Sequence, residues 1–508
     1  MKLKRELGIW TAVLVVVASM IGSGILGSTG LAQENVGSAA GVMLLWFVCG
    51  LVALAGALCY AELAVAMPHA GGEYIYIKNI FGALPSFLSG WVSFIVGFSA
   101  PVAAACLLSG DYALKILPQD SLAYVWLADE IVFFTYGSGA EATTVALAHK
   151  KIYACLLVLL FSAIHIVGAR SGGVVQNILT VIKLLLIASF TIGGLYVGFS
   201  GGGIPLSEAF SDFNIEVSGL GVGFMFVFFA FCGFNGATYL AEEIKDPDKN
   251  LPRALLYGTL MTSVLYCLIN IVYYMAIPVD QLAGETAVAS VAAGNLFGPW
   301  VKNFYNYAFC FMLFSTISAM TMIGPRVYFA MARDNLFFKM AANINPRFGT
   351  PMMAILLQAC LAMAYILTGT YESISFFMQY ALSIFPILTV LGLFLLRRSN
   401  PELKAKYRTP LFPLLPLFFA VFSVVMMYLA YREWTETSQI AIGAVLMGVP
   451  IYFIWIFFQK RSSNDDSAGP GLPAINTGII SGSHIDTELH DEPETPDVSR
   501  EPVLSARD

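Results

Sequence analysis

Two glycine-containing segments interrupt apolar stretches of the chain and have the residue types of a small-molecule site. They are Ile21-Gly22-Ser23-Gly24-Ile25 and Phe231-Cys232-Gly233-Phe234-Asn235-Gly236. Glycine weakens a helix and lets backbone amides and carbonyls face a cavity. Amides at the start of a half-helix suit a carboxylate, and exposed carbonyls suit an ammonium group. An amino acid, which carries both groups, matches this pair of breaks.

The breaks have an alternative explanation as helix-packing seams. Small residues commonly mediate close helix contact in membranes. Taken alone, each segment fits a packing role as well as it fits a binding site. The two segments lie five predicted helices apart, however, and interrupted helices at corresponding positions of two five-helix repeats mark the central site of a transporter. Together the breaks therefore favour a binding site.

Lys183 is the most informative charged residue, because it lies within an apolar stretch. Inserting a lysine at mid-span costs roughly 2.5 to 3.5 kcal/mol, so the position needs a physical reason. Snorkelling to the membrane surface, or hydrogen bonds to carbonyls of the broken first helix, would supply one. Burial also disfavours a charged amine, so proton exchange at Lys183 is a further alternative.

Other polar residues carry weaker signals. Ser315 and Thr316, in the eighth apolar stretch, are either sodium ligands or hydroxyls that bond back to their own helix, and the second explanation is the commoner one for their type. A further group lies near predicted inner helix ends and forms either a solvated face or an inner gate whose ion pairs change between states. Its members are Glu62, Glu242, Glu243 and Arg253.

The composition places all of these residues in a membrane protein. Of 508 residues, 58% are apolar and 12% are charged, against about 25% charged in a typical soluble domain. Apolar runs recur that are long enough to cross about 30 Å of hydrocarbon as helices. The stretch from Leu122 to Phe134 is not counted among them, because Asp129 and Glu130 at its centre argue against spanning. The twelve predicted spans are residues 9–33, 40–67, 84–115, 151–168, 173–199, 219–244, 254–277, 302–333, 352–369, 372–396, 412–431 and 438–459.

Most Lys and Arg residues fall on one side of these spans, the side of the N-terminus. The positive-inside rule therefore predicts that both termini are cytoplasmic. Residues 461–508 are rich in Asp, Glu, Ser, Pro and Gly, and they predict a disordered cytoplasmic tail. The chain has no Asn-x-Ser/Thr sequon, which favours a prokaryotic source and hence a multi-pass protein of the plasma (bacterial inner) membrane.

Six motifs follow one another along the chain. They are Ile21-Gly22-Ser23-Gly24-Ile25, Tyr60-Ala61-Glu62-Leu63, Gly71-Gly72-Glu73-Tyr74, Phe229-Ala230-Phe231-Cys232-Gly233-Phe234, Asn250-Leu251-Pro252-Arg253-Ala254 after Glu242-Glu243, and Gly324-Pro325-Arg326 leading to Met331-Ala332-Arg333-Asp334. In this order they resemble the amino acid–polyamine–organocation superfamily, in particular its bacterial permeases and its L-type and cationic amino acid transporter branches. The resemblance runs from about Leu7 to Lys460.

This resemblance implies an all-α membrane fold of about twelve transmembrane helices. It has a LeuT-type core of two inverted five-helix repeats, residues 9–199 and 219–396, joined by an outer loop at residues 200–218. A cytoplasmic N-terminus, residues 1–8, precedes the core. Two additional C-terminal helices, with the cytoplasmic loop before them, follow at residues 397–460.

By position, the resemblance also implies roles around the breaks. The backbone amides of Gly22, Ser23 and Gly24 form a carboxylate cradle, and Asn235 lines the side-chain pocket. Phe229 is an aromatic gate over bound substrate; the alternative is that it only packs among Phe226, Phe228 and Phe231. The backbone carbonyls expected to contact the substrate ammonium group are those of Ile21, Phe229, Ala230 and Cys232. Two neighbouring residues, Ile25 and Phe231, are also expected to contribute to substrate binding.

The activity implied is secondary-active amino acid transport by alternating access. Phe231, Phe234 and Cys232, with no acidic residue aligned to a cationic side chain, favour neutral substrates. The alternatives are a cationic amino acid or polyamine transporter of the same fold and, from another class, a channel or receptor-like protein. Lys183 stands where sodium-coupled relatives bind a cation. This implies sodium independence and leaves open both proton coupling and exchange for a second amino acid.

The expected partners are the amino acid substrate, protons or a counter-transported amino acid, and membrane lipid. Enzyme activity and a metal site are not expected, because His69, His149 and His165 lack metal-site spacing and no nucleophile motif occurs. A cofactor and a nucleic-acid partner are not expected either. L-type relatives bind a single-span partner through a cysteine in the outer loop after the third span. That loop, residues 118–150, has no cysteine here, so a disulfide-linked heavy chain is not expected.

Overall fold

The computed structural model describes residues 7–68, 71–136, 143–167, 169–211, 215–345, 347–399 and 406–465. The chain divides into two compact units, Met1–Leu472 and Pro473–Asp508, and every described residue belongs to the first. Residues 466–508 lie outside the described residues, so the disordered tail stays a prediction, as does the arrangement of residues 1–6.

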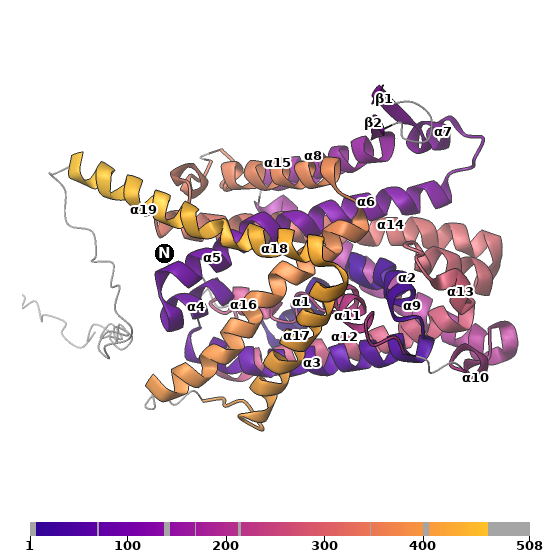
Figure 1. The fold of residues 1–508 in the computed structure, drawn as a ribbon, viewed down its shortest axis with the longest axis horizontal. Coiled ribbons are helices and arrows are strands. Elements are labelled where there is room, and N and C mark those ends of the chain that lie inside the picture. Colours follow the sequence, from indigo (N-terminus) through magenta and orange to yellow (C-terminus); the bar gives the residue numbers. More distant parts are fainter. Residues whose placement is uncertain are drawn as a thin grey trace, which may run out of the picture. The chain divides into compact units, whose positions relative to one another are not determined.

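Helices make up almost all of the described chain (Figure 1). The α-helices are α1 (Ile9–Met20), α2 (Ser23–Val36), α3 (Ala39–Ala66), α4 (Glu73–Phe81), α5 (Ala83–Val92), α6 (Ser99–Ile116), α7 (Leu122–Ala128), α8 (His149–Val167), α9 (Ala169–Val197), α10 (Leu206–Ala209), α11 (Leu220–Ala230), α12 (Pro247–Ala276), α13 (Val279–Leu282), α14 (Val288–Arg333), α15 (Met352–Thr368), α16 (Tyr371–Ser399), α17 (Leu414–Glu433), α18 (Thr435–Leu446) and α19 (Gly448–Asp465). Shorter π- and 3₁₀-helical segments are η1 (Ser93–Phe98), η3 (Gly198–Gly202), η4 (Gly236–Leu240) and η5 (Lys339–Ala342), and the strands are β1 (Glu130–Tyr136) and β2 (Thr143–Ala148).

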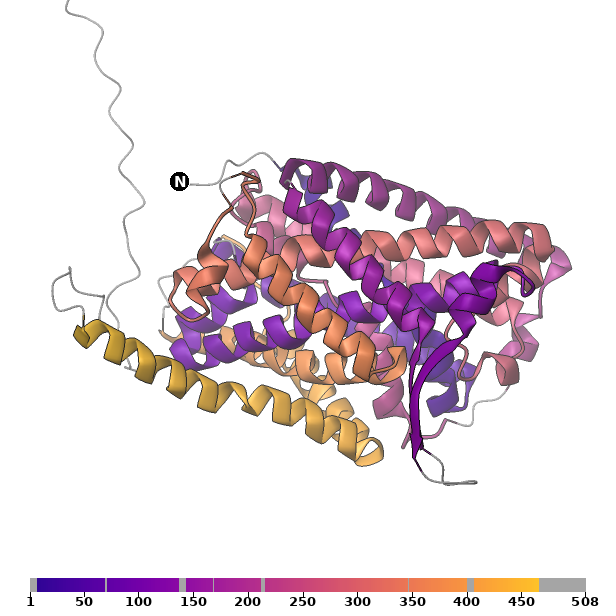
Figure 2. The ribbon, with the colours of Figure 1, turned by 90° about the horizontal axis from the view of Figure 1, so that it is seen from above.

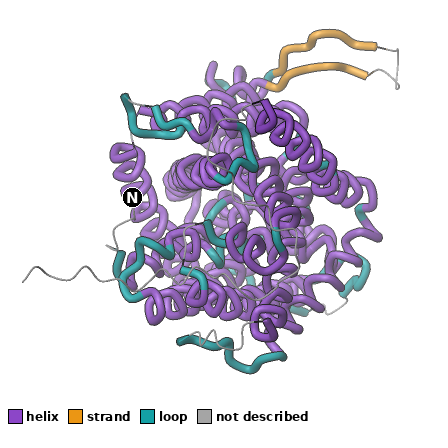
Figure 3. The backbone as a smooth tube through the Cα atoms, turned by 90° about the vertical axis from the view of Figure 1, so that its left-hand side faces the viewer, coloured by secondary structure: helices purple, strands orange, loops and turns teal. Residues whose placement is uncertain are grey.

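The two strands form one antiparallel hairpin, which stands apart from the helices in Figure 2 and Figure 3. The stretch from Leu122 to Phe134 is therefore a short helix and part of a strand, and it is not a span. This agrees with the argument from Asp129 and Glu130, since charges at the centre of a hydrocarbon-spanning helix are unfavourable.

Every predicted span overlaps a helix or a broken helix pair. Within the described residues, nine helices are long and apolar enough to cross a membrane, and the bent pair α1 and α2 makes a tenth. Helices α11 and α15 are apolar but shorter. The helical, membrane-spanning architecture is therefore confirmed, while the count of twelve and the inverted repeat stay predictions.

Several helix ends differ from the predicted ones. Helix α12 starts at Pro247 instead of residue 254, because proline fits the first turn of a helix. Helix α14 starts at Val288, well before residue 302, and a kink at Gly298, before Pro299, separates this first segment from the predicted span. Helix α19 continues to Asp465, past the predicted end of the last span, so residues 461–465 are helical and the prediction that the disordered tail starts at residue 461 is wrong.

Both predicted breaks are present, and they touch. Helices α1 and α2 meet at an angle of 41°, with Gly22 in an extended conformation between them. After α11, residues 231–235 form turns that lead into η4. Gly233 has a φ of +103°, and a Cβ at this position would lie 2.7 Å from the carbonyl oxygen of Ser19. Glycine is required here both by the left-handed backbone and by the close approach of the two breaks.

Candidate functional site

A cavity of about 150 Å³ lies where the two breaks meet. The first break contributes Gly22, Ser23 and Gly24 to its wall, as the sequence predicts for a shared site. The second break, from Phe228 to Tyr239, contributes a large part of the remaining lining, and most of the rest comes from η1, α14 and α16. Apolar side chains dominate, alongside a few amides and hydroxyls and one carboxyl group. These other lining residues include Phe98, Phe229, Cys232, Asn235, Tyr239, Met320, Ile323, Met378, Gln379, Leu382 and Ser383.

Four predicted binding residues lie beside this cavity without lining it. The carbonyls of two of them already accept hydrogen bonds from the protein, Ile21 from Lys183 (2.7 Å) and Ile25 from Tyr273 (3.1 Å), and that of Ala230 lies 2.9 Å from the Tyr266 hydroxyl. The fourth, Phe231, packs its ring against Trp46 and Tyr266. These residues hold the shape of the breaks.

Tyr266 of α12 joins the two breaks, and sequence reasoning missed it. Its hydroxyl donates to the carbonyl of Met20 at 2.7 Å and lies 2.9 Å from the carbonyl of Ala230. Both carbonyls are at helix ends, where no intrahelical donor is available. The only sequence signal is a polar tip in an apolar stretch, which many tyrosines in this chain share.

Lys183 of α9 is fully buried at 0% exposure, and its amine donates to the carbonyls of Ala18 (2.9 Å) and Ile21 (2.7 Å). The predicted hydrogen bonds to the broken first helix are therefore confirmed. The amine supplies donors to carbonyls that the bend between α1 and α2 leaves without helical partners.

Ser315 and Thr316 of α14 do not bond back to their helix, so that prediction is wrong. Neither hydroxyl oxygen has a hydrogen-bond partner among the described residues. The Thr316 side chain instead faces the first break, where its methyl group would lie 3.3 Å from a Cβ placed on Gly22.

Phe229 is distinguished from the neighbouring phenylalanines by its surroundings. Phe226, Phe228 and Phe231 each pack against other aromatic rings, such as Trp434, Phe224 and Trp46. Phe229 has no ring contact with the described residues, and it lines the cavity. The role of Phe229 as a gate stays a prediction.

Glu73 is a cavity residue that sequence reasoning did not assign. Its Oε1 atom accepts hydrogen bonds from Tyr60 of α3 and from Thr389 of α16 (3.3 Å). Burial raises the pKa of this carboxyl to about 7. A Cβ on Gly72, where φ is +52°, would lie 2.9 Å from the ring of Tyr239. The glycine therefore lets the start of α4 approach η4 and places Glu73 in the cavity wall.

Among the described residues, Glu62 of the predicted inner gate pairs with an arginine outside the predicted set. Glu62 pairs with Arg397 of α16 through two hydrogen bonds of 2.8 and 2.7 Å, and its Oε2 also accepts from the amide of Thr409 (2.7 Å). Glu243 receives the amide of Leu7 on its backbone carbonyl. Glu242 is half-buried and Arg253 is exposed. Sequence reasoning did not identify Arg397 as the partner of Glu62. The two residues lie 335 positions apart in the chain, so their spacing does not predict that they pair.

Replacing Arg397 with glutamine should lower the unfolding temperature of the detergent-purified protein. The Glu62 side chain is 5% exposed and would lose its charge partner, which we expect to destabilise the fold by about 3 kcal/mol or more. The matched control is Arg398→Gln, because Arg398 is the exposed neighbour and its loss should change stability by no more than about 0.5 kcal/mol. Equal unfolding midpoints for the two variants would show that the pair contributes nothing.

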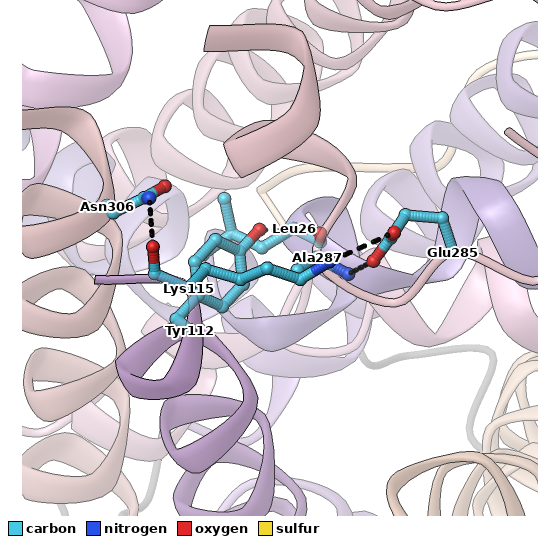
Figure 4. Close-up of polar contacts among 6 residues, drawn as sticks. All are labelled: Leu26, Tyr112, Lys115, Glu285, Ala287 and Asn306. Atoms are coloured by element: carbon cyan, nitrogen blue, oxygen red, sulfur yellow. Dashed lines mark hydrogen bonds and ion pairs between the residues drawn. The ribbon is translucent and has the colours of Figure 1, made fainter. Parts of the chain in front are cut away.

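Contacts on the other side of the break tie α2, α6 and the start of α14 together (Figure 4). Tyr112 donates to the carbonyl of Leu26 (3.0 Å), and Lys115 pairs with Glu285 (3.4 Å). The second carboxylate oxygen of Glu285 accepts from the amide of Ala287 (2.7 Å). These contacts join α2, α6 and the segment before α14. None of their residues lines the central cavity, whose wall includes Glu73.

Comparisons with known proteins agree with the motifs. A family model described as amino acid permease matches residues 7–458. The chain is 27% identical over 463 residues to b(0,+)-type amino acid transporter 1 of Mus musculus, covering 90% of this chain and 89% of that protein. It is 29% identical over 467 residues to Large neutral amino acids transporter small subunit 2 of Homo sapiens, covering 90% of this chain and 82% of that protein.

Proposed function

Because the chain belongs to the amino acid permease family, within the amino acid–polyamine–organocation superfamily, we propose that it is a secondary-active amino acid transporter working by alternating access. The observation that carries the proposal is that two broken helices, far apart in the sequence, line one cavity. The chain is a multi-pass membrane protein, and we place it in the plasma membrane with both termini in the cytoplasm, on the distribution of its Lys and Arg residues.

The substrate backbone binds between the breaks. The amides of Gly22, Ser23 and Gly24, at the start of α2, hold the carboxylate, because a helix N-terminus offers unpaired donors and positive potential. The carbonyls of Phe229 and Cys232 receive the ammonium group, and that of Phe229 does so with its second lone pair, because it also accepts from the amide of Cys232 (3.1 Å). Those of Ile21 and Ala230 lie beside the cavity without lining it and hold the shape of the breaks.

Neutral amino acids fit the cavity wall. Met320, Ile323 and Leu382 supply apolar surface, and Asn235 and Gln379 supply polar groups without charge. A mostly apolar pocket with a few placed polar groups is the usual form of a small-molecule site. The relative named for large neutral amino acids supports the same class.

Transport is independent of sodium in this proposal. The Lys183 amine occupies the carbonyls of Ala18 and Ile21 beside the first break, where it provides the positive charge that a bound cation would otherwise supply. The second candidate is sodium coupling, which the unpartnered hydroxyls of Ser315 and Thr316 favour. The energy source is either a proton gradient or exchange for a second amino acid.

The test is uptake of a labelled amino acid mixture by the purified full chain in proteoliposomes, followed by competition of one labelled substrate with each of the twenty amino acids. Uptake should saturate, and neutral amino acids should compete best.

Replacing sodium by choline should not change the rate of uptake. Empty and amino-acid-loaded vesicles, with and without a pH gradient, separate proton symport from exchange. A conductance without saturable uptake would overturn the proposal in favour of a channel, and strict sodium dependence would favour the second candidate.

Phe229→Ala should slow uptake severely and weaken substrate binding much less. The ring lines the cavity without packing on another described ring, so its removal opens the site while the backbone groups remain in place. Initial uptake rates and equilibrium binding of the same labelled substrate are the two measurements. Equal losses would make Phe229 a direct contact, and unchanged transport would return it to a packing role.

A further inference from the structure

A second cavity, of about 270 Å³, lies where α12 begins, beside the segment that leads into α17. We call it the basic cavity. Lys249 and Arg253 come from the first turns of α12, and Lys406 and Tyr407 come from the segment before α17. Asp248 is the one acid among the described residues that line it. In the proposed orientation, the basic cavity lies on the cytoplasmic side of the membrane.

The basic cavity carries more positive than negative charge. Lys406 pairs with Asp248, so one of its three cations has a partner in the protein. Lys249 and Arg253 have no ion pair among the described residues, and they lie four positions apart on one face of α12. Like charges at this spacing repel each other, and an anion held between them would offset the repulsion.

Hydrogen bonds to α3 hold the segment before α17 in place. The amide of Thr409 donates to Oε2 of Glu62 (2.7 Å), and the Thr409 hydroxyl donates to the carbonyl of Leu58 (3.3 Å). Tyr407 and Lys406 lie two and three positions before this anchor. The protein therefore fixes both walls of the basic cavity by itself, and a pre-formed cavity is the usual form of a ligand site.

Apolar side chains continue from the basic cavity along both helices. Tyr257, one helical turn after Arg253, and Leu260 are exposed on α12, and Leu414 and Leu417 are exposed on α17. Both helices are candidate spans, and both pack against α3. Side chains exposed on a span face the acyl chains of lipids, so the cations of the basic cavity lie near the level of the lipid phosphates.

We propose that the basic cavity binds the head group of an anionic phospholipid. Lys249 and Arg253 hold the phosphate, because arginine pairs with phosphate oxygens through two parallel hydrogen bonds and lysine adds a point charge. Lys406 has two further N–H donors beyond its bond to Asp248. The acyl chains lie along the exposed faces of α12 and α17.

The excess of positive charge selects among head groups. Phosphatidylglycerol has a phosphate diester without an attached cation, so its net charge complements that of the basic cavity. Phosphatidylcholine carries its own ammonium group, which the cations of the cavity repel. A soluble phosphate has the same charged group but lacks the acyl chains that contact the exposed apolar side chains.

The test measures binding of dioleoyl phosphatidylglycerol and dioleoyl phosphatidylcholine to the detergent-purified full chain, by native mass spectrometry at increasing lipid concentration. Wild-type protein should retain phosphatidylglycerol at lower concentration than phosphatidylcholine. In the double variant Lys249→Gln with Lys406→Gln, the apparent affinity for phosphatidylglycerol should fall about 30-fold, since each basic residue near a membrane surface contributes about a fivefold factor.

The matched control is the double variant Lys339→Gln with Arg347→Gln. It removes two exposed positive charges assigned to the same side of the membrane, and neither residue lines the basic cavity. Its affinity for phosphatidylglycerol should equal that of the wild type. Equal losses in the two double variants would overturn the inference, because net charge alone would then decide lipid binding.

Asp248→Asn should change the affinity in the opposite direction. Loss of this acid frees Lys406 and makes the basic cavity more positive, so phosphatidylglycerol should bind about fivefold more tightly. A merely structural role of the Lys406–Asp248 pair predicts a different result. Lys406→Gln and Asp248→Asn would then both lower the unfolding temperature, and neither would change the preference for phosphatidylglycerol.

Two further outcomes would overturn the inference. One is equal affinity of the wild-type protein for the two lipids. The other is displacement of phosphatidylglycerol by an equal concentration of sn-glycerol 3-phosphate, since the ligand would then be a soluble phosphate. All of these measurements follow binding without transport, so the result neither depends on the proposed function nor decides it.

Discussion

Gly24→Ala should abolish transport. A Cβ at this position would lie 2.6 Å from the Cα and 2.9 Å from the backbone nitrogen of Ala230, and backbone atoms cannot rotate away as a side chain can. Helices α2 and α11 would have to separate, at a cost of about 1 to 3 kcal/mol in packing. The amides of the carboxylate cradle would move with α2, and misplacement of about 1 Å at a reacting or binding site can reduce rates about 100-fold.

The control for Gly24→Ala is Gly443→Ala. A Cβ on Gly443 of α18 would have no neighbour within 4 Å, so alanine should be accommodated and uptake should stay unchanged. Initial uptake rate, substrate affinity and size-exclusion behaviour are measured for both variants. Wild-type affinity and uptake in a folded Gly24→Ala protein would contradict the assignment of the cradle to this break.

Lys183→Met should reduce uptake about as severely as Gly24→Ala does. Methionine keeps the approximate volume of the side chain but removes the donors to the carbonyls of Ala18 and Ile21. Each buried acceptor left unpaired costs about 1 to 3 kcal/mol, and two such losses correspond to roughly 100-fold or more. The measurements are uptake in proteoliposomes and the unfolding temperature of the purified protein.

Lys151→Met is the matched control, because Lys151 also donates to a backbone carbonyl, that of Leu367, but at an exposed site. It should retain wild-type uptake. The coupling mode decides what else Lys183→Met loses. If proton exchange at Lys183 drives transport, the variant should lose pH-driven accumulation but retain substrate binding. Lys183→Met protein with normal uptake and stability would show that the two hydrogen bonds are dispensable.

The spans, the breaks and the bonding of Lys183 were accessible from the sequence because each depends on local chemistry. Apolar stretches must lie in hydrocarbon as helices, since the bilayer offers no partner for backbone polar groups. Glycine within such stretches marks where the helix is weakest, as at Gly22 and Gly233. A lysine at mid-span must find acceptors, and the broken first helix was the nearest supply of free carbonyls.

Helix ends were harder to predict, because proline and glycine have positional effects. Pro247 begins α12 and Gly298 kinks α14, although each is also common in loops. The same local reasoning failed for Thr316, whose hydroxyl was expected to bond back to its helix. Its side chain instead lies beside Gly22 of the first break, and sequence spacing does not indicate that position.

By itself, then, the sequence determined which segments are buried as helices, where two of them break, and which family these features indicate. Only the tertiary structure decided which distant side chains meet: Arg397 with Glu62, Tyr266 with both breaks, and Glu73 with the cavity. The physical reason is that burial and helix formation depend on residues a few positions apart. The partner of a buried charge depends on which helices pack side by side, and that information is spread over the whole chain.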